Sequence, residues 1–263
     1  MPAGRPAGRA RYRLTGRPIP FPDVDRARAR AKFGIGEGQT CVLVFGGSLG
    51  ARSINLATIA AFAGPDAGAD ASSNAGDGQA ASGLAASGGA GEALPASALA
   101  QRLRAGALGV LHISGRRDYP ELRARWSISD RLPAGYDLRE YLDLEEFATA
   151  LAAADLVIAR SGGSVFEIAA YGLPAILIPY PHASADHQSA NARWMADAGA
   201  AVVIADEELT GPRLASELAG LLDDRARLAA MAEASRGLAR PRAAEEVAEE
   251  LLAAAATRWG AGA

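Results

Sequence analysis

Short apolar runs alternate with longer segments of helical periodicity from about residue 25 to the C-terminus. Apolar runs of this kind predict buried strands, and the longer segments predict amphipathic helices. The predicted strands are 41–45, 109–114, 136–142, 155–159, 175–178 and 201–204. The predicted helices are 25–33, 52–63, 99–105, 118–126, 144–153, 164–172, 184–198, 209–222, 225–238 and 243–255. Because strands and helices alternate, we expect a Rossmann-like α/β fold, a parallel sheet with helices on both faces.

Two segments lack this pattern. Residues 1–24 are rich in Arg, Pro and Gly without periodicity, which predicts an irregular basic arm. Residues from about 64 to 100 are mostly Ala, Gly, Ser and Asp, with too few large apolar side chains to offset the entropy of ordering them. We therefore expect one domain over 25–263, interrupted by a disordered insertion.

Composition narrows the class of protein. The 263 residues carry a formal net charge of −3, which gives no support to a nucleic-acid binder with a large basic surface. The single cysteine, Cys41, excludes an internal disulfide and favours the cytoplasm. No apolar run reaches the roughly 18 residues of a membrane span. The arm arginines (Arg5, Arg9, Arg11, Arg13 and Arg17) could contact anionic headgroups peripherally, but a solvated tail is the more common role.

Glycine turns follow two of the predicted strands. Gly46–Gly50 comes after the strand 41–45, and Arg160–Ser164 comes after the strand 155–159. The carboxyl ends of parallel strands share one edge of the sheet, and ligands bind there. Backbone amides at such turns hold phosphate groups. Two turns at one edge suit a diphosphate, although the second turn alone could simply cap a helix.

Polar side chains accompany the second turn. Glu167 is expected one helical turn beyond Ser164, where a carboxylate can accept two hydrogen bonds from a ribose diol or serve as a helix cap. Asp186 to Asn191 offers donors and acceptors that suit sugar hydroxyls. His182, His187 and Asp186 lack the further ligand that a metal site needs, so we predict no metal. We expect His112, which alternates with apolar neighbours, to be a core or edge residue rather than a ligand.

The ordered motifs resemble the MurG family, the bacterial UDP-N-acetylglucosamine:lipid I N-acetylglucosaminyltransferases of peptidoglycan synthesis, which serve cell-wall growth and division. The matching runs are VFGGSLGAR at 44–52, ADLV at 154–157, RSGGS at 160–164, EIAAYGLPA at 167–175 and DHQSANA at 186–192. The resemblance implies the donor-binding half of a GT-B glycosyltransferase, which inverts the anomeric carbon without a metal or other cofactor.

The resemblance also assigns residues to the donor. Ser48, with Gly47 nearby, and the turn Gly162, Gly163 and Ser164 would hold the diphosphate. Glu167 would bind the ribose, and the backbone of Leu142 would contact uracil. His187 and Gln188 would hold GlcNAc hydroxyls, with Asp186 and Asn191 as further candidates. An arginine of the family falls on Pro20 here, so its nucleotide contact is either lost or supplied by Arg17.

The catalytic residue cannot be assigned from this chain. The resemblance implies a base in an N-terminal acceptor domain, which has no counterpart before Leu14. We therefore expect the chain to supply the donor half of a transferase that converts lipid I into lipid II. The alternative is a non-catalytic UDP-sugar-binding subunit or pseudoenzyme that requires a separate acceptor-domain chain. A UDP-GlcNAc epimerase of similar architecture is a weaker third candidate, because its acid and base carboxylates are not evident.

Overall fold

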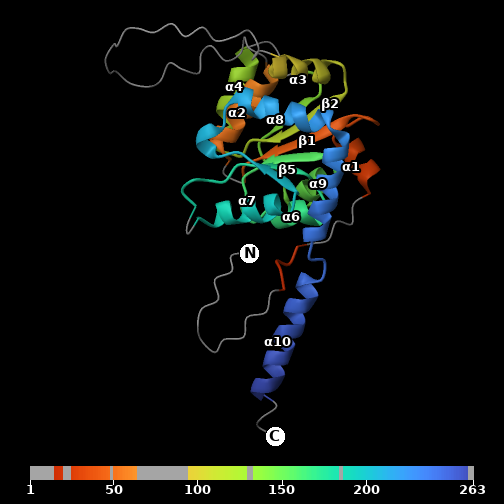
Figure 1. Cartoon of the computed structure of the whole chain (residues 1–263), viewed down its shortest axis with the longest axis vertical. Helices are drawn as coiled ribbons and strands as arrows, with labels where there is room; N and C mark the ends of the chain where they lie inside the picture. Colours follow the sequence, from red (N-terminus) through yellow and green to blue (C-terminus); the bar gives the residue numbers. More distant parts are fainter. Residues whose placement is uncertain are drawn as a thin grey trace, which may run out of the picture.

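A computed structural model describes residues 15–19, 25–47, 50–63, 94–128, 133–183 and 186–259. A six-stranded parallel sheet forms its centre, in the order β3-β2-β1-β4-β5-β6 (Figure 1). The strands are β1 (Thr40–Phe45), β2 (Leu108–Ile113), β3 (Tyr136–Arg139), β4 (Leu156–Ala159), β5 (Ala175–Leu177) and β6 (Ala201–Val203). Every neighbouring pair is parallel. The predicted fold class is confirmed.

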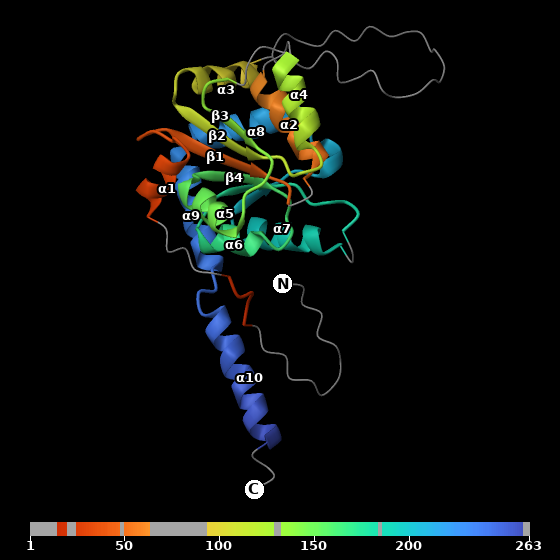
Figure 2. The same ribbon diagram turned by 180° about the vertical axis from the view of Figure 1, so that it is seen from behind.

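Helices cover both faces of the sheet, as Figures 1 and 2 show from opposite sides. One face carries α2 (Arg52–Ala63), α3 (Leu94–Arg104), α4 (Tyr119–Ile128) and α8 (Gly211–Asp223). The other carries α1 (Arg26–Lys32), α5 (Leu144–Ala153), α6 (Val165–Ala170) and α7 (His187–Asp197). Helix α9 (Arg225–Leu238) contributes side chains to both apolar cores, and the 3-10 helix η3 (Asp206–Glu208) follows β6.

The central strands have no exposed face. All six residues of β1 are buried, and so are all those of β2 and β4. Cys41 lies on β1 with no exposed surface, and burial is the main cause that raises the pKa of its thiol to about 12. His112 of β2 is equally buried, which confirms the expectation of a core histidine.

Local sequence explains where several helices begin. Asp143 accepts a hydrogen bond from the Glu146 amide (2.8 Å) and begins α5, and Thr210 and Asp224 cap α8 and α9 in the same way. Helix α3 begins at Leu94, inside the range predicted as an insertion, and buries Leu99 and Leu103. Residues 64–93 of that range and residues 1–14 of the predicted arm lie outside the described part of the chain.

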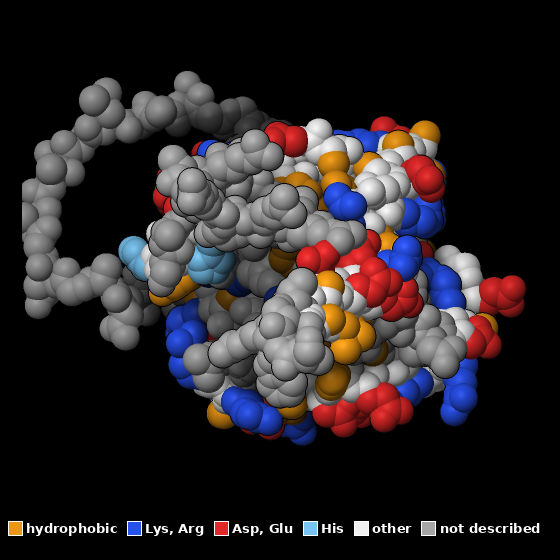
Figure 3. Space-filling model, turned by 90° about the horizontal axis from the view of Figure 1, so that it is seen from below, with side chains coloured by type: hydrophobic (Ala, Val, Ile, Leu, Met, Phe, Trp, Pro, Cys, Tyr) orange, Lys and Arg blue, Asp and Glu red, His pale blue; other side chains and the backbone are white. Residues whose placement is uncertain are grey.

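Helix α10 (Ala243–Trp259) projects from the body (Figures 1 and 2). Ala243 at its start is buried, whereas Leu251 and Leu252 are 66% and 72% exposed. Viewed from below, acidic and apolar side chains lie next to one another near the middle of the molecule (Figure 3). In the part of the chain that the structure describes, no helix is both long and apolar enough to cross a bilayer.

Candidate functional site at the carboxyl edge of the sheet

A cavity of about 1110 Å³ opens beyond the carboxyl ends of the strands. It lies where the strand order reverses, between β1 and β4, because the chain leaves β1 toward β2 and β3 and then returns to β4. Crevices at such reversal points are where open α/β sheets bind ligands. Residues of both glycine turns line this cavity, so the structure brings the two predicted phosphate-binding turns together.

The first turn approaches the start of α2 closely. A side chain at Gly46 would collide with the backbone and methyl group of Ala51. Gly47 and Gly50 have φ angles of +97° and +88°, which favour glycine strongly, and the Gly50 amide donates to the Gly47 carbonyl (2.9 Å). These positions therefore require glycine, and the described residues of the turn line the cavity. Ser48, the residue predicted to bind the diphosphate here, lies outside the described residues.

The second turn is supported from α7. The buried Ser161 hydroxyl donates to the carbonyl of Gln188 (2.8 Å), and Asn191 Nδ2 donates to the carbonyls of Ser161 (3.0 Å) and Gly162 (3.3 Å). Ser164 stands at the N-cap position of α6, but its side chain accepts no capping hydrogen bond. Helix α6 has only six residues and a correspondingly small dipole. Any anion binding here therefore rests on the turn itself and on nearby cations.

Arg17 reaches this turn from the N-terminal segment. Its guanidinium occupies the space that a side chain at Gly163 would need, and it lines the cavity together with Glu167. Burial raises the pKa of the Glu167 carboxyl, and the positive charge of Arg17 partly opposes that shift. The pair thus places one acceptor and one donor group side by side at the edge of the cavity.

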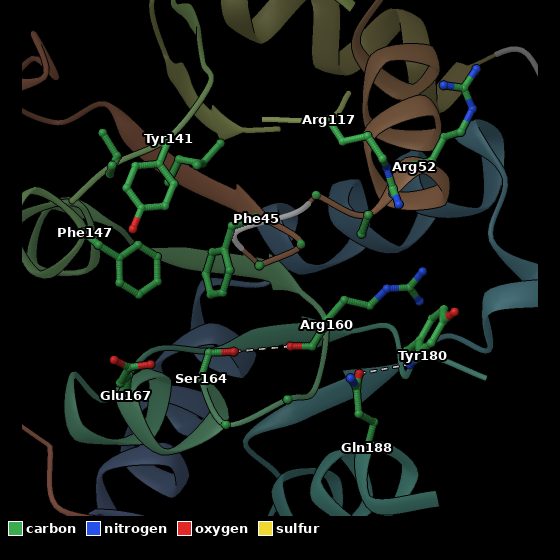
Figure 4. Close-up of a pocket in the computed structure, with 18 of the residues that line it drawn as sticks. Phe45, Arg52, Arg117, Tyr141, Phe147, Arg160, Ser164, Glu167, Tyr180 and Gln188 are labelled. Carbon is green, nitrogen blue, oxygen red and sulfur yellow. Dashed lines mark hydrogen bonds between the residues drawn. The ribbon is translucent and has the colours of Figure 1, made fainter. Parts of the chain in front are cut away.

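An aromatic wall borders the β3 side of the cavity. Phe45 and Phe147 meet edge to face with ring centroids 5.0 Å apart, and Tyr141 is 41% exposed with the Arg116 guanidinium 4.1 Å from its ring centroid. Leu142 lies beside them and lines the cavity. Figure 4 shows the wall and Glu167 on one side of the cavity, and Tyr180 and Gln188 on the other.

Arg160 ties together the ends of several strands. Its Nη1 donates to Asp206 Oδ1 (2.6 Å) and to the carbonyls of Ile178 and Pro179, and its Nη2 donates to Ser53 Oγ (2.8 Å). Ser53 also donates to Asp206 (2.7 Å). The side chains of Arg160 and Asp206 are only 12% and 22% exposed. Much of the Arg160 charge is therefore balanced within the protein.

The predicted site residues divide into two groups. Those that line the cavity are Arg17, Gly47, Leu142, Gly162, Gly163, Ser164, Glu167 and Gln188. His187 and Asp186 are exposed and do not line it, and Asn191 supports the second turn from behind. Sequence reasoning missed Arg117, Tyr141, Phe147, Tyr180 and Asp206, which also line it. Most of these follow a strand end closely, which is the signal that could have found them.

Gln188 is held in place by the backbone. Its side-chain oxygen accepts from the Tyr180 amide (3.0 Å), which leaves its amide group as a donor toward the cavity. Within the described ranges, no group of three His, Cys, Asp or Glu side chains is arranged to hold a metal ion.

The strand order reverses between β1 and β4, and glycine turns lie at the carboxyl edge of the sheet. These features define a Rossmann-like domain of the kind that binds nucleotides. A sequence profile described as the glycosyltransferase family 28 C-terminal domain matches residues 89–247. The chain belongs to this family.

Curated relatives carry the name UDP-N-acetylglucosamine–N-acetylmuramyl-(pentapeptide) pyrophosphoryl-undecaprenol N-acetylglucosamine transferase. The relative from Burkholderia multivorans is 46% identical over 53% of this chain and 37% of its own length. The relative from Desulforudis audaxviator is 36% identical over 97% of this chain and 60% of its own length. These matches confirm the resemblance to the MurG family. The chain spans only part of these relatives.

A solved structure supports the same conclusion. The crystal structure of Acinetobacter baumannii MurG superimposes with a TM-score of 0.55 at 25% identity, covering 85% of this chain and 52% of that one. The fold is therefore that of one half of a GT-B glycosyltransferase.

Proposed function

We propose that this chain binds UDP-N-acetylglucosamine in the crevice between β1 and β4, as the donor half of a transferase that converts lipid I into lipid II. The observation that carries the proposal is the order of groups along the cavity. The aromatic wall and Glu167 lie at one side of the cavity and Gln188 at the other, with Ser164 of the second glycine turn between them (Figure 4). The ligand likewise has a base and a ribose at one end, a diphosphate in the middle and a sugar at the other end.

Each group suits the part of the ligand assigned to it. Aromatic and apolar side chains around Leu142 favour a flat base, and the Glu167 carboxylate can accept hydrogen bonds from both ribose hydroxyls. The backbone of Gly46, Gly47 and Gly50 and of the turn Gly162–Ser164 suits the phosphates, with Ser48 and Arg17 as further contacts. Gln188 would donate to a GlcNAc hydroxyl. His187 lies outside the cavity, so we assign it no direct contact.

The proposal is tested by calorimetric titration of the full chain with UDP-GlcNAc, UDP and 2′-deoxy-UDP. Glu167→Ala should weaken UDP by about tenfold or more, because hydrogen bonds to a charged group contribute about 1.5–3 kcal/mol. The loss should be smaller for 2′-deoxy-UDP, which lacks one of the hydroxyls.

Glu233→Ala is the matched control. Glu233 is an exposed carboxylate on α9 that pairs with Arg236 and does not line the cavity. Absence of UDP-GlcNAc binding to the wild-type chain at millimolar ligand would contradict the donor site. Equal losses for UDP and 2′-deoxy-UDP would contradict the ribose assignment.

The transfer itself requires a group that removes the acceptor proton. We propose that this base belongs to an acceptor half, either on the same polypeptide or on a separate chain. Turnover of UDP-GlcNAc with a lipid I analogue should then depend on an acceptor-half protein. If an acceptor half supports binding without turnover, the non-catalytic subunit is the correct reading.

We also propose cytoplasmic placement with peripheral contact at the membrane, because the acceptor named in the relatives is linked to undecaprenol, a membrane lipid. Arg5, Arg9, Arg11 and Arg13 of the arm would supply an electrostatic contact. Cosedimentation with anionic vesicles should fall with added salt and after removal of residues 1–14. Equal sedimentation with and without these residues would contradict a role for the arm.

A further inference from the structure

A chain of hydrogen bonds runs from the core of the sheet to the rim of the cavity. His112 of β2 lies between the Tyr136 hydroxyl, 2.6 Å from its Nδ1, and Asn55 Oδ1 of α2, 2.9 Å from its Nε2. Asn55 Nδ2 then donates to the Ser114 carbonyl (2.9 Å) and to Asp118 Oδ2 (2.8 Å). His112 and Asn55 are completely buried, and Asp118 is 3% exposed.

The direction of each bond is fixed. The carbonyl of Ser114 and the carboxylate of Asp118 only accept, so the Asn55 amide nitrogen must face them and its oxygen must face His112. His112 therefore donates from Nε2 and accepts the Tyr136 hydroxyl proton at Nδ1. Burial lowers the pKa of His112 to about 3, which agrees with this neutral tautomer. No other assignment of donors and acceptors satisfies every side chain in this hydrogen-bond chain.

The hydrogen-bond chain ends at a cation that lines the cavity. Arg117 Nε donates to Asp118 Oδ1 (3.1 Å), while its side chain remains 64% exposed and lines the cavity. Among the described residues, this is the ion pair recorded for Arg117, and it uses only one edge of the guanidinium. The tip of Arg117 points toward the cavity, whereas Arg52 turns away and pairs with Glu121 (Figure 4).

Asp118, which anchors this cation, also lies next to the first glycine turn. A side chain at Gly50 would meet the Ser114 carbonyl and would lie 3.0 Å from Asp118 Oδ2. Asp118 therefore fixes the position of Arg117 relative to Gly50. Among the described residues, no hydrogen bond or ion pair engages the two terminal nitrogens of Arg117, so they are available to a phosphate oxygen.

We infer that Arg117 binds the diphosphate of the nucleotide-sugar, and that Asp118, held by Asn55 and His112, is the positioning residue that aims it. The inference rests on the proposed donor site and adds a specific contact to it. Arg117 lies away from the aromatic wall, so the contact concerns the phosphates rather than the base.

Ligand truncation separates this contact from general stabilisation. In titrations of the full chain, Arg117→Gln should weaken UDP about tenfold, as expected for one charge-assisted hydrogen bond. The affinity for uridine should not change, because uridine has no phosphate. Arg227→Gln, which removes an exposed cation on α9 paired with Glu217, is the control with the same change in charge. An unchanged UDP affinity in Arg117→Gln overturns the inference.

Asp118→Asn tests the positioning role by the sign of its effect. If Asp118 acted only through its charge, its neutralisation would strengthen the binding of an anion. If it positions Arg117, neutralisation weakens UDP several-fold, and the loss disappears in the Arg117→Gln background because the two residues act as one unit. Stronger binding, or an equal loss in both backgrounds, overturns the positioning role.

Failure of the inference and failure of the donor site give different results. If the wild-type chain binds neither UDP nor UDP-GlcNAc, the donor site is wrong. If the wild type binds both and Arg117→Gln binds them equally well, the donor site stands and only the Arg117 contact is wrong. Thermal unfolding of each variant shows whether a loss of binding reflects a loss of folded protein.

Discussion

Individual buried groups at this site have clear energetic consequences. His112 is neutral in the folded chain, since burial lowers its pKa from an ordinary value of 6.5 to about 3. An unfolded chain would protonate it near pH 6.5. The unfolded state therefore binds more protons between these two values, and the histidine makes folding less favourable as the pH falls.

His112→Gln should reduce this acid sensitivity. The free energy of unfolding of the wild type should fall by up to about 1.4 kcal/mol per pH unit below 6.5 from this residue alone. A glutamine does not titrate, so the difference between wild type and variant should shrink as the pH is lowered from 7 to 4. Urea unfolding at several pH values measures it. Parallel profiles for the two proteins would show that His112 is not the titrating group.

Residue positions also explain what the sequence could and could not predict. Gly46–Gly50 and Gly162–Glu167 were recognisable because each is a local succession of strand, turn and helix. The contact between Ser53 and Asp206 joins residues 153 positions apart, so no local pattern could predict it. His187 and Gln188 differ in outcome because the helix turns neighbouring side chains to different sides, and only Gln188 lines the cavity.

At the scale of elements, the glycine turn before α2 is constrained twice. Gly50 has a positive φ and also leaves no room for a side chain beside the Ser114 carbonyl. Gly38 has a positive φ of +76° with nothing within 4 Å of an added methyl group. Substitutions at these two glycines therefore distinguish the cost of backbone strain from the cost of a close approach.

Gly38→Ala should cost about 1 kcal/mol of unfolding free energy from strain alone, and it should leave UDP affinity unchanged. Gly50→Ala should cost about 2–4 kcal/mol, because the turn must also move away from Ser114 and Asp118. It should weaken UDP as well. Chemical denaturation and calorimetry measure the two effects. Equal losses of stability in both variants would mean that the close approach is unimportant.

The strand ends on the other side of the cavity depend on Arg160. Asp206→Asn should destabilise the chain by about 1–3 kcal/mol, because a mostly buried guanidinium loses its charged partner. Asp223→Asn removes a carboxylate that pairs with Arg102 but is 66% exposed, and it should cost less than about 1 kcal/mol. Urea unfolding compares them. Similar small losses for both would show that the Arg160 cluster contributes little.

At the scale of the whole molecule, the crevice and the main core are largely independent of α10. From residue 251 to residue 256 every side chain of this helix is exposed, whereas the helices on the sheet bury one side each. The position of the cavity is set by the reversal of the strand order between β1 and β4. The alternation of strands and helices predicted a parallel sheet but not the order of its strands. The order depends on pairing between strands that are far apart in the sequence.

Deletion of residues 248–263 should therefore change the free energy of unfolding by less than about 1 kcal/mol. A deletion that begins at residue 228 removes Leu228 and Met231 from the core and should abolish cooperative unfolding. Circular dichroism during urea titration distinguishes the two. A large loss in the shorter deletion would mean that α10 stabilises the body.

The buried cysteine has a practical consequence. Cys41 is the only thiol in the chain, it lies on β1, and neither its exposure nor its pKa permits alkylation in the folded state. Modification of this thiol thus requires the sheet to open. The rate at which the thiol is labelled therefore measures the rate of global unfolding. Because Cys41 does not react in the folded state, a cysteine introduced at Leu252 can be labelled selectively with a fluorophore, and the natural thiol need not be removed. A label at this position would report on the surroundings of α10 without altering the sheet.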